Sequence, residues 1–309
     1  MIAKIRHELK FGNTHYYTRI SERVLKNRYR GALEKHVKNL PPLALEKDNS
    51  KLTLAILANK RNFYESVAAL YSFCFWKRDL LIHYHEDGTL TGAEIDLLKR
   101  TFAGITVFKK ANEDVKVQEY LSSKNLDKCA SLRSHFIFSL RLFDMLIEKQ
   151  TPYLLQIDSD VLFFSRPGVI LNIIDSENNN GCYNLDLPNA AYTFGDDAMK
   201  EILSVPVIQR FNAGVFLHNF DDALFEFTED ILNKRPEAVN SWHLEQTIFA
   251  MYASLKGGFI ALPKEYDLGR RERNAGNKII SEHYVHSTGH DFHKDFIDKL
   301  FPIYTGKNS

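Results

Sequence analysis

The stretch from Pro152 to Phe164 constrains the fold of this chain more than any other. A mostly apolar run leads into Asp158 and Asp160, and a second apolar run follows them. An apolar run of this length, entered through a proline, is typical of a strand buried on both faces. A buried carboxylate is costly unless it is paired or binds a metal. Since alternate residues of a strand point to the same side, we expect both aspartates to hold one cation at the strand's carboxyl end, where open α/β sheets bind ligands.

Strand-like and helix-like segments alternate through the first half of the chain. We predict strands over residues 52–58, 79–85 and 105–108, and helices over residues 63–76, 91–100 and 126–147. Thr91 and Glu94 have the spacing of a capping box at the start of the second helix. A strand–helix–strand order of this kind predicts a mixed, mostly parallel α/β sheet flanked by helices.

The pattern changes beyond residue 164, where the predicted strands become shorter. They cover residues 181–185, 213–217, 259–262 and 279–286, with helices at 196–203, 224–233 and 242–255. A polar segment with three arginines, residues 266–278, is predicted to be a mobile loop that closes over phosphates or is simply solvated. We find no clear domain boundary after residue 50, so we expect one domain over residues 51–309, with a nucleotide-binding half (51–164) and an acceptor half (165–309).

Composition excludes several classes of protein. The chain has 309 residues with a net charge of +1, which argues against a general nucleic-acid binder. The sequence contains no run of 18 or more apolar residues, so we do not expect a membrane span. The first residues lack the apolar core of a signal peptide, and the three cysteines are far apart, which fits a reducing cytosol. We therefore expect a cytoplasmic protein.

The N-terminal segment is unusually basic. Residues 1–40 hold ten Lys or Arg against three Glu, a net charge of +7. We interpret residues 1–50 as a helical extension that ends at Pro41 and Pro42 and a linker. The segment is either a solvated helical cap or a surface that contacts an anionic acceptor or the inner face of an anionic membrane.

Several motifs, taken in order, resemble the GT-A-fold glycosyltransferases, most closely glycosyltransferase family 8 and its bacterial relatives. The similarity covers roughly residues 50–300. The motifs that carry it are Arg141-Leu142, Leu155-Gln156-Ile157-Asp158-Ser159-Asp160, Phe211-Asn212-Ala213-Gly214-Val215-Phe216-Leu217, Leu244-Glu245-Gln246-Thr247 and His286-Ser287-Thr288-Gly289. Each is weak alone, but their order and spacing make the resemblance specific.

The resemblance implies a divalent cation and its ligands. In that family the first aspartate contacts the nucleotide ribose and the metal, the second holds the metal, and a later histidine completes the set; these positions match Asp158, Asp160 and His286. Oxygen ligands favour Mg²⁺ or Mn²⁺, and an imidazole favours Mn²⁺. The family's Lys-Pro after the glycine is missing here, and Lys294 is the candidate replacement for its phosphate-binding lysine. A core histidine is the alternative role of His286.

Other residues are candidates for the donor. In such folds the loop after the first strand holds the base and ribose, which points to Asn59 and Lys60, although a plain polar turn would look the same. Arg141 is placed to reach the diphosphate or the sugar, because guanidinium pairs bidentately with phosphate. The alternative for Arg141 is a salt bridge with Asp144 or Glu148.

Three residues are candidates for the reaction centre. Asn212 would face the sugar, because Gly214 allows the backbone to approach closely. Glu245 would act as a base in an inverting reaction, or Gln246 would stabilise an oxocarbenium-like centre in a retaining one. A helix-terminal charge is the alternative for Glu245.

The sequence therefore predicts a metal-dependent glycosyltransferase. It would move a sugar from a nucleotide-diphosphate sugar, expected to be a UDP-sugar, to a hydroxyl of a carbohydrate, glycolipid or protein, and the resemblance implies retention of configuration. The alternatives are a sugar-phosphate nucleotidyltransferase, which the absence of a Gly-rich loop after residue 58 disfavours, and a non-catalytic binding protein on the same scaffold.

Overall fold

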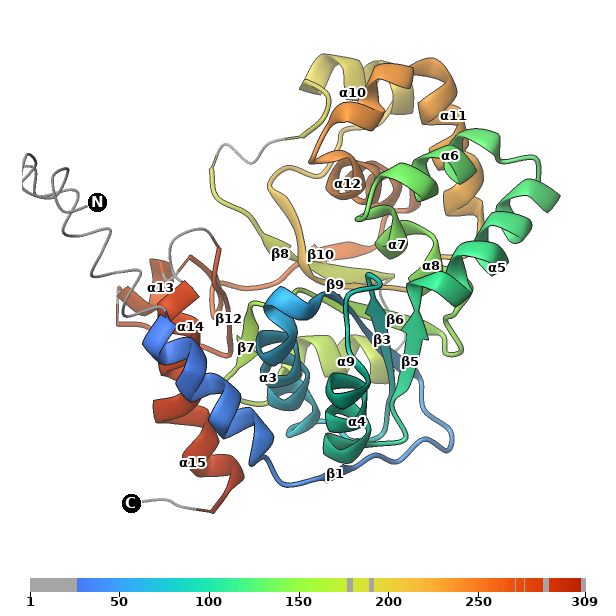
Figure 1. Cartoon of the computed structure of the whole chain (residues 1–309). Coiled ribbons are helices and arrows are strands. Elements are labelled where there is room, and N and C mark those ends of the chain that lie inside the picture. Colours follow the sequence, from blue (N-terminus) through green and yellow to red (C-terminus); the bar gives the residue numbers. More distant parts are fainter. Residues whose placement is uncertain are drawn as a thin grey trace, which may run out of the picture.

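A seven-stranded sheet forms the centre of the molecule and carries helices on both faces (Figure 1). This computed structural model describes residues 27–176, 180–188, 192–269, 271–274, 276–285 and 289–306. The strand order is β10-β8-β9-β6-β2-β3-β5. Strands β6, β2, β3 and β5 are parallel, whereas β9 is antiparallel to both β6 and β8. The predicted mixed, mostly parallel α/β sheet is confirmed.

The strands of this sheet are short and mostly buried. Their bounds are β2 Leu52–Ala58, β3 Leu81–Glu86, β5 Thr106–Lys109, β6 Tyr153–Ile157, β8 Gly181–Leu185, β9 Phe211–His218 and β10 Phe259–Ala261. Two smaller sheets accompany it. The first pairs β1 (Leu43–Ala44) with β4 (Phe102–Ala103), and the second has the order β11-β12-β7, with bounds Tyr266–Leu268, Ser281–His283 and Val161–Phe163.

The longer helices have the bounds α3 Phe63–Cys74, α4 Gly92–Thr101, α5 Lys110–Ser123, α6 Asp127–His135, α9 Gly168–Ser176, α10 Asp196–Leu203, α11 Ala223–Lys234 and α12 Leu244–Lys256. Helices α3, α4, α10, α11 and α12 lie near their predicted positions, whereas α5 and α9 were not predicted. The capping box is present, since the Thr91 N–H donates to Glu94 Oε2 at 2.7 Å. The short helices are η1 Lys60–Asn62, α7 Ser139–Leu142, α8 Asp144–Ile147, η2 Pro236–Asn240, α13 Arg271–Asn274, α14 Gly289–Asp295, η4 Phe296–Leu300 and α15 Phe301–Tyr304.

Two sequence-based predictions of local structure are wrong. The expected long helix over residues 126–147 is broken into α6, α7 and α8, because Phe136 is extended (φ −118°, ψ 108°) and ends α6. The segment expected to be a mobile loop, residues 266–278, contains β11 and α13. Arg273 in that segment lies 2.9 Å from the buried Glu282 and stacks over the half-buried Phe164, and these contacts hold it. Periodicity did not show the first break, because the apolar spacing continues through it, although the residues from Ser134 to Ser139 have only intermediate helix propensity.

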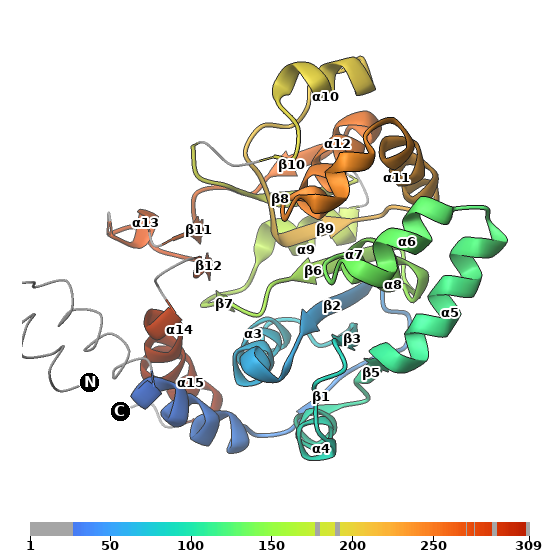
Figure 2. The same cartoon turned by 45° about the horizontal axis from the view of Figure 1, so that its top comes forward.

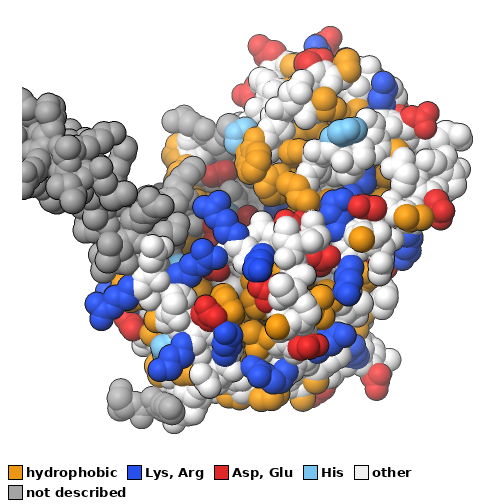
Figure 3. Space-filling view, viewed as in Figure 1, with side chains coloured by type: hydrophobic (Ala, Val, Ile, Leu, Met, Phe, Trp, Pro, Cys, Tyr) orange, Lys and Arg blue, Asp and Glu red, His pale blue; other side chains and the backbone are white. Residues whose placement is uncertain are grey.

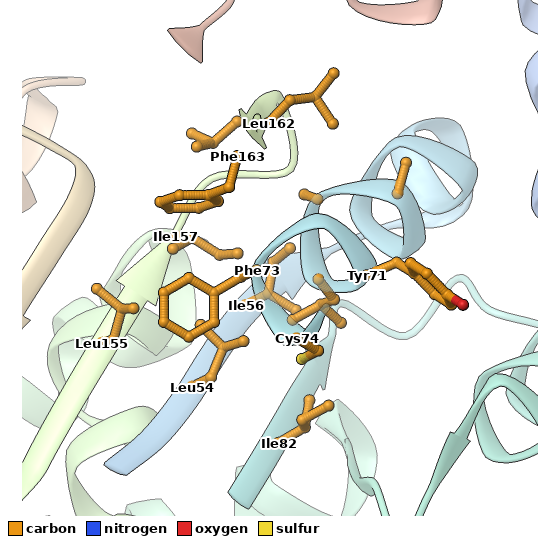
Figure 4. Packing of buried hydrophobic residues seen from close by; sticks show 14 of the residues in the cluster. Leu54, Ile56, Tyr71, Phe73, Cys74, Ile82, Leu155, Ile157, Leu162 and Phe163 are labelled. Carbon is orange, nitrogen blue, oxygen red and sulfur yellow. The ribbon is translucent and has the colours of Figure 1, made fainter. Parts of the chain in front are cut away.

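The core below the sheet fixes the strand that carries the aspartates. Helix α3 packs on β2, β3 and β6, and its apolar side chains meet those of the strands (Figure 4). Phe73 of α3 and Phe163 of β7 lie edge to face, with ring centroids 5.1 Å apart. Leu155 and Ile157 of β6 belong to the same cluster, as do Leu162 and Phe163 of β7. The turn between β6 and β7, with both aspartates, is therefore held from both ends.

The described part of the N-terminal segment packs on the domain. Residues 27–38 form a helix that lies beside α14 and α15 near the C-terminus (Figures 1 and 2). Leu33 and Val37 are fully buried and belong to the main core cluster, and the His36 ring contacts Phe301 with a centroid distance of 4.6 Å. The boundary at residue 50 stays a prediction. Within the described residues, no helix is sufficiently long and apolar to cross a membrane.

Candidate metal centre and adjoining cavities

Asp158 and Asp160 lie in the tight turn between β6 and β7, at the carboxyl end of a central strand. The Asp158 N–H donates to the carbonyl of Gly214 at 2.9 Å, which ties the turn to β9. Their side chains remain 33% and 42% exposed, so neither carboxylate is buried as a bare charge. The sequence-based placement of both aspartates on one edge of the sheet agrees with this geometry.

A third group joins them from a strand that is distant in sequence. Strand β12 pairs antiparallel with β7, and this register places His283 opposite Val161. His283 Nε2 lies 3.2 Å from Asp160 Oδ1 and 3.5 Å from Asp158 Oδ2. One ligand atom from each of the three residues lies within 4.8 Å of the others. The predicted ligand His286 lies outside the described residues, so its role stays a prediction.

The tautomer of His283 follows from its neighbours. The Gly214 N–H donates to Asn212 Oδ1 at 2.9 Å, and the Asn212 Nδ2 donates to Asp186 at 3.2 Å, which fixes the orientation of that amide. His283 Nδ1 lies 3.1 Å from the same Asn212 Oδ1 and must donate to it. In the neutral ring Nε2 is then a bare acceptor that faces two carboxylates. A cation or a proton has to separate them, and this donor set fits a hard divalent ion.

The charge balance around His283 agrees with this requirement. Burial disfavours the charged ring, but the carboxylates of Asp160 and Asp158, with a smaller contribution from Asp186, outweigh that and raise the pKa of His283. The site attracts positive charge, whether it is carried by the imidazole or by an ion. Asn212 orients the His283 ring through the contact of its Oδ1 with Nδ1.

Gly214 leaves room for His283. A Cβ at this position would lie 2.2 Å from His283 Cε1 and 2.4 Å from its Nδ1, which is shorter than any tolerable contact. The close approach that the sequence indicated at this glycine is made by the His283 imidazole. A direct contact between Asn212 and a sugar stays a prediction, since the described contacts of its side chain are with Asp186, Gly214 and His283.

Arg141 is buried beside Asp158. Its guanidinium donates to Asp158 Oδ1 at 2.8 Å, to the Ala213 carbonyl at 2.6 Å and to Gln156 Oε1 at 3.2 Å. Its Nε also lies 3.2 Å from Glu245 Oε1. Arg141 thus fixes the first aspartate, and it is paired with neither of the acidic residues, Asp144 and Glu148, that were its alternative partners. Contact with a diphosphate stays a prediction for this residue.

Glu245 and Gln246 begin helix α12 beside these groups. Glu245 is 6% exposed, and burial raises its pKa to about 7, helped by Asp158 and opposed by Arg141. Gln246 is half-buried, and its Oε1 accepts from the Ala213 N–H at 3.4 Å. Both side chains line the adjoining smaller cavity.

Two cavities meet at Asp158. The larger has a volume of about 630 Å³ and contacts the helix of residues 27–38, the loop after β2 and both aspartates. The smaller, of about 190 Å³, is lined by Phe138, Arg141, Asp158, Ala213, Gly214, Trp242, His243, Glu245 and Gln246. A ligand that spans both would place its middle at Asp158. This arrangement suits a molecule with a large end, a charged centre and a small end.

The remaining candidates are divided between these cavities and the surface. Asn59 lines the larger cavity, and its side chain caps η1 by accepting from the N–H groups of Arg61 and Asn62. Lys60 and Lys294 are exposed, and the described residues that line the two cavities include neither. Their roles as donor-binding residues stay predictions.

Sequence reasoning missed His283. It did place residues 279–286 in one strand, but the third position of β12 carried no motif of its own. Only the antiparallel pairing of β12 with β7 brings this side chain to the aspartates.

Solved structures of glycosyltransferases share this fold. Glycosyltransferase GlyE from Streptococcus pneumoniae TIGR4 superposes with a TM-score of 0.50 at 13% identity, over 84% of this chain and 63% of GlyE. The bifunctional glycosyltransferase WbbM gives 0.53 at 16% identity, over 85% and 53%. Galactosyltransferase LgtC, solved with donor and acceptor sugar analogues, gives 0.51 at 12% identity, over 82% and 94%.

The likeness establishes the class of fold, a GT-A glycosyltransferase fold. This chain spans less than two thirds of GlyE and of WbbM and nearly the whole of LgtC. No protein-family model matches the chain. No curated protein matches it in sequence either.

Proposed function

We propose that the protein transfers a sugar from a nucleoside-diphosphate sugar to an acceptor hydroxyl, with a divalent ion held by Asp158, Asp160 and His283. The observation that carries this proposal is the convergence of two carboxylates and a bare imidazole nitrogen where the two cavities meet. The resemblance of the motifs to glycosyltransferase family 8 and the GT-A fold support the same class of reaction. Mn²⁺ is the preferred ion because the donor set includes an imidazole.

Each cavity suits one part of the donor. The larger has room for a nucleoside, with Asn59 near the base, and the smaller takes the sugar beside Gln246. The diphosphate would then lie at Asp158 and Asp160. A divalent ion there would neutralise the charge that develops on the departing diphosphate. UDP is the expected nucleotide, on the strength of the family resemblance.

The protein's own groups position the reacting atoms. Arg141 holds Asp158, and Asn212 holds the His283 ring, so the ligand set is preorganised. Glu245 also lines the smaller cavity, but it is buried against Arg141, and that ion pair competes with a role as a base. Gln246 borders the sugar cavity with a neutral amide. These two positions favour retention of configuration over inversion.

A thermal-shift matrix tests the proposal. UDP-glucose, UDP-galactose, UDP-N-acetylglucosamine and GDP-mannose are each added with Mn²⁺, with Mg²⁺ or with EDTA. A ligand that binds only the folded state raises its stability by RT ln(1 + [L]/Kd), so a donor shifts the melting temperature when the ion is present and not with EDTA. Equal shifts with and without the ion would contradict the metal site. Proton NMR of the first product formed reports the anomeric configuration.

A further inference from the structure

Two aromatic side chains form a ledge at the mouth of the smaller cavity. The rings of Phe138 and Trp242 lie with centroids 4.6 Å apart and planes at 79°. Trp242 is 70% exposed, the largest exposed fraction among the big apolar side chains of the described residues. Both rings line the cavity that also contains Glu245 and Gln246. We call Phe138 and Trp242 the aromatic ledge.

The ledge is held from two separate parts of the chain. Phe138 lies where the predicted long helix breaks between α6 and α7, and Phe136 packs against it with centroids 5.6 Å apart. Trp242 lies just before α12, two residues after η2. Because the helix breaks here, the Phe138 side chain can pack against Trp242. Figure 3 shows hydrophobic side chains exposed in the hollow beside α12, with Lys and Arg side chains along the edge below it.

The aromatic rings and the polar groups beside them determine which kind of ligand would fit the ledge. An aromatic face is electron-rich and attracts the weakly positive C–H groups on one face of a pyranose ring, while polar groups at the rim bind its hydroxyls. His243 and Gln246 supply such polar groups beside the ledge. A nucleobase would also stack on an aromatic ring, and Phe138 borders the cavity of about 630 Å³ as well. Trp242 lines only the smaller of the two cavities, so the exposed indole lies on the side of Glu245 and Gln246.

We propose that the aromatic ledge is a stacking subsite for a pyranose ring of a saccharide acceptor. The proposal rests on the proposed function and specifies its acceptor as a carbohydrate with a continuous C–H face, such as a β-galactoside. The stacked ring would present a hydroxyl toward the smaller cavity. There the hydroxyl oxygen bonds to the anomeric carbon as the bond from that carbon to the diphosphate oxygen breaks. The diphosphate leaves with the bonding electron pair and takes the hydroxyl proton.

The test compares Trp242→Ala and Trp242→Phe with the wild type and with Val239→Ala. Val239 lies in η2 and is 42% exposed, so its truncation controls for a change in surface apolarity near the ledge. Transfer is measured to methyl β-D-galactopyranoside, to methyl β-D-glucopyranoside and to glycerol, which has hydroxyls but no ring. We expect Trp242→Ala to raise KM for the two pyranosides at least tenfold and Trp242→Phe to recover most of that loss. The change in KM for glycerol and the change in donor hydrolysis should both be several-fold smaller than the change for the pyranosides.

Two outcomes would overturn the subsite. An equal loss for glycerol and pyranosides would give Trp242 a structural role, and loss of UDP binding in Trp242→Ala would make the ledge a nucleobase platform. A binding measurement separates these results from the reaction itself. The chain has two tryptophans, so Trp76→Phe leaves Trp242 as the only indole, and its fluorescence is titrated with methyl β-D-galactopyranoside without donor.

This titration also distinguishes failure of the subsite from failure of the proposed function. A saturable change with the pyranoside, together with no response to any nucleotide sugar, would leave the subsite standing and remove the transferase. Donor binding that depends on Mn²⁺, together with no fluorescence change up to the solubility of the pyranoside, would remove the subsite and leave the transferase.

Discussion

Arg133 and Arg141 lie eight residues apart, and each pairs with an aspartate, but the two pairs differ in their surroundings. Arg133 makes two bonds to Asp144, at 2.6 and 2.7 Å, and both side chains are almost fully buried. Arg141 makes one bond of 2.8 Å to Asp158, whose side chain is 33% exposed and faces two cavities.

The difference teaches how to tell a structural ion pair from a functional one. Arg133 also lies 3.0 Å from Asp114, and Lys110 lies 2.7 Å from that second carboxylate. The two carboxylates at Arg133 are therefore balanced by two cationic side chains of the protein. Asp158 shares its surroundings with Asp160 and His283, and the single guanidinium of Arg141 cannot balance two carboxylates. The charge that is missing there is the reason to expect a cation.

The largest effect is expected when the buried pair of Arg133 and Asp144 is broken. Arg133→Ala should lower the free energy of unfolding by about 3–5 kcal/mol, because it leaves Asp144 buried and uncompensated. Urea unfolding measures it. Arg235→Ala is the control, since Arg235 is 36% exposed and its pair with Glu201 contributes at most about 1 kcal/mol. A loss below about 1 kcal/mol at Arg133 would mean that water reaches Asp144.

The next largest effect is expected on catalytic turnover when a proposed metal ligand is removed. Asp160→Ala should reduce Mn²⁺-dependent donor turnover on the order of 100- to 1,000-fold, with little loss of stability, because Asp160 is 42% exposed. Release of UDP, followed by chromatography, measures it. Asp175→Ala on α9 removes an exposed carboxylate elsewhere and should behave as the wild type. Turnover at the wild-type level in Asp160→Ala would remove the metal hypothesis.

A third change disturbs the imidazole without touching a ligand. Gly214→Ala places a Cβ 2.2 Å from His283 Cε1, so the ring must move, and Mn²⁺ affinity should fall by about 100-fold. Titration calorimetry measures it. Gly168→Ala is the matched control, because a Cβ there meets nothing within 4 Å.

The same titration compares His283→Ala with His286→Ala. If Mn²⁺ affinity is unchanged in Gly214→Ala and His283→Ala but falls in His286→Ala, the ligand that the sequence predicted is correct and His283 is a neighbour. A fall in all three variants would place both histidines in the site.

The smallest effect concerns Glu245, which burial holds at a pKa of about 7. In the unfolded chain this carboxyl releases its proton near pH 4.5, so between pH 4.5 and 7 the folded state binds more protons and stability falls as the pH rises. The contribution should be about 2 kcal/mol between pH 4 and pH 6. Glu245→Gln should remove that slope in denaturant titrations, and Glu201→Gln, at a side chain that is 76% exposed, should keep it. An unchanged slope in Glu245→Gln would show that Arg141 keeps Glu245 ionised.

Local pattern was enough for much of the first half of the fold. Strand β2 matches its predicted bounds, and α3 and α4 differ by two residues or fewer at either end. Side-chain alternation and caps act over a few residues, and a sequence displays them directly. Helices α5 and α9 were missed, although α9 has a clear apolar stripe.

Among the site residues, the sequence by itself determined the two aspartates and the side of the sheet on which they lie. Both aspartates lie in the turn directly after β6 rather than within the strand, so their place at this edge follows from where the buried strand ends, which a local pattern of residues shows. The sequence also singled out Gly214, Arg141, Glu245 and Gln246, which the structure gathers within one region.

Only the tertiary structure determined which residues these site residues contact. The pairing of β12 with β7 brings His283 to the aspartates. The break after α6 lets Phe138 contact Trp242, and the packing of α12 brings Glu245 next to Arg141. Each of these contacts joins residues far apart in sequence. Register, helix breaks and burial depend on how the whole chain packs, so no local pattern of residues could have fixed them.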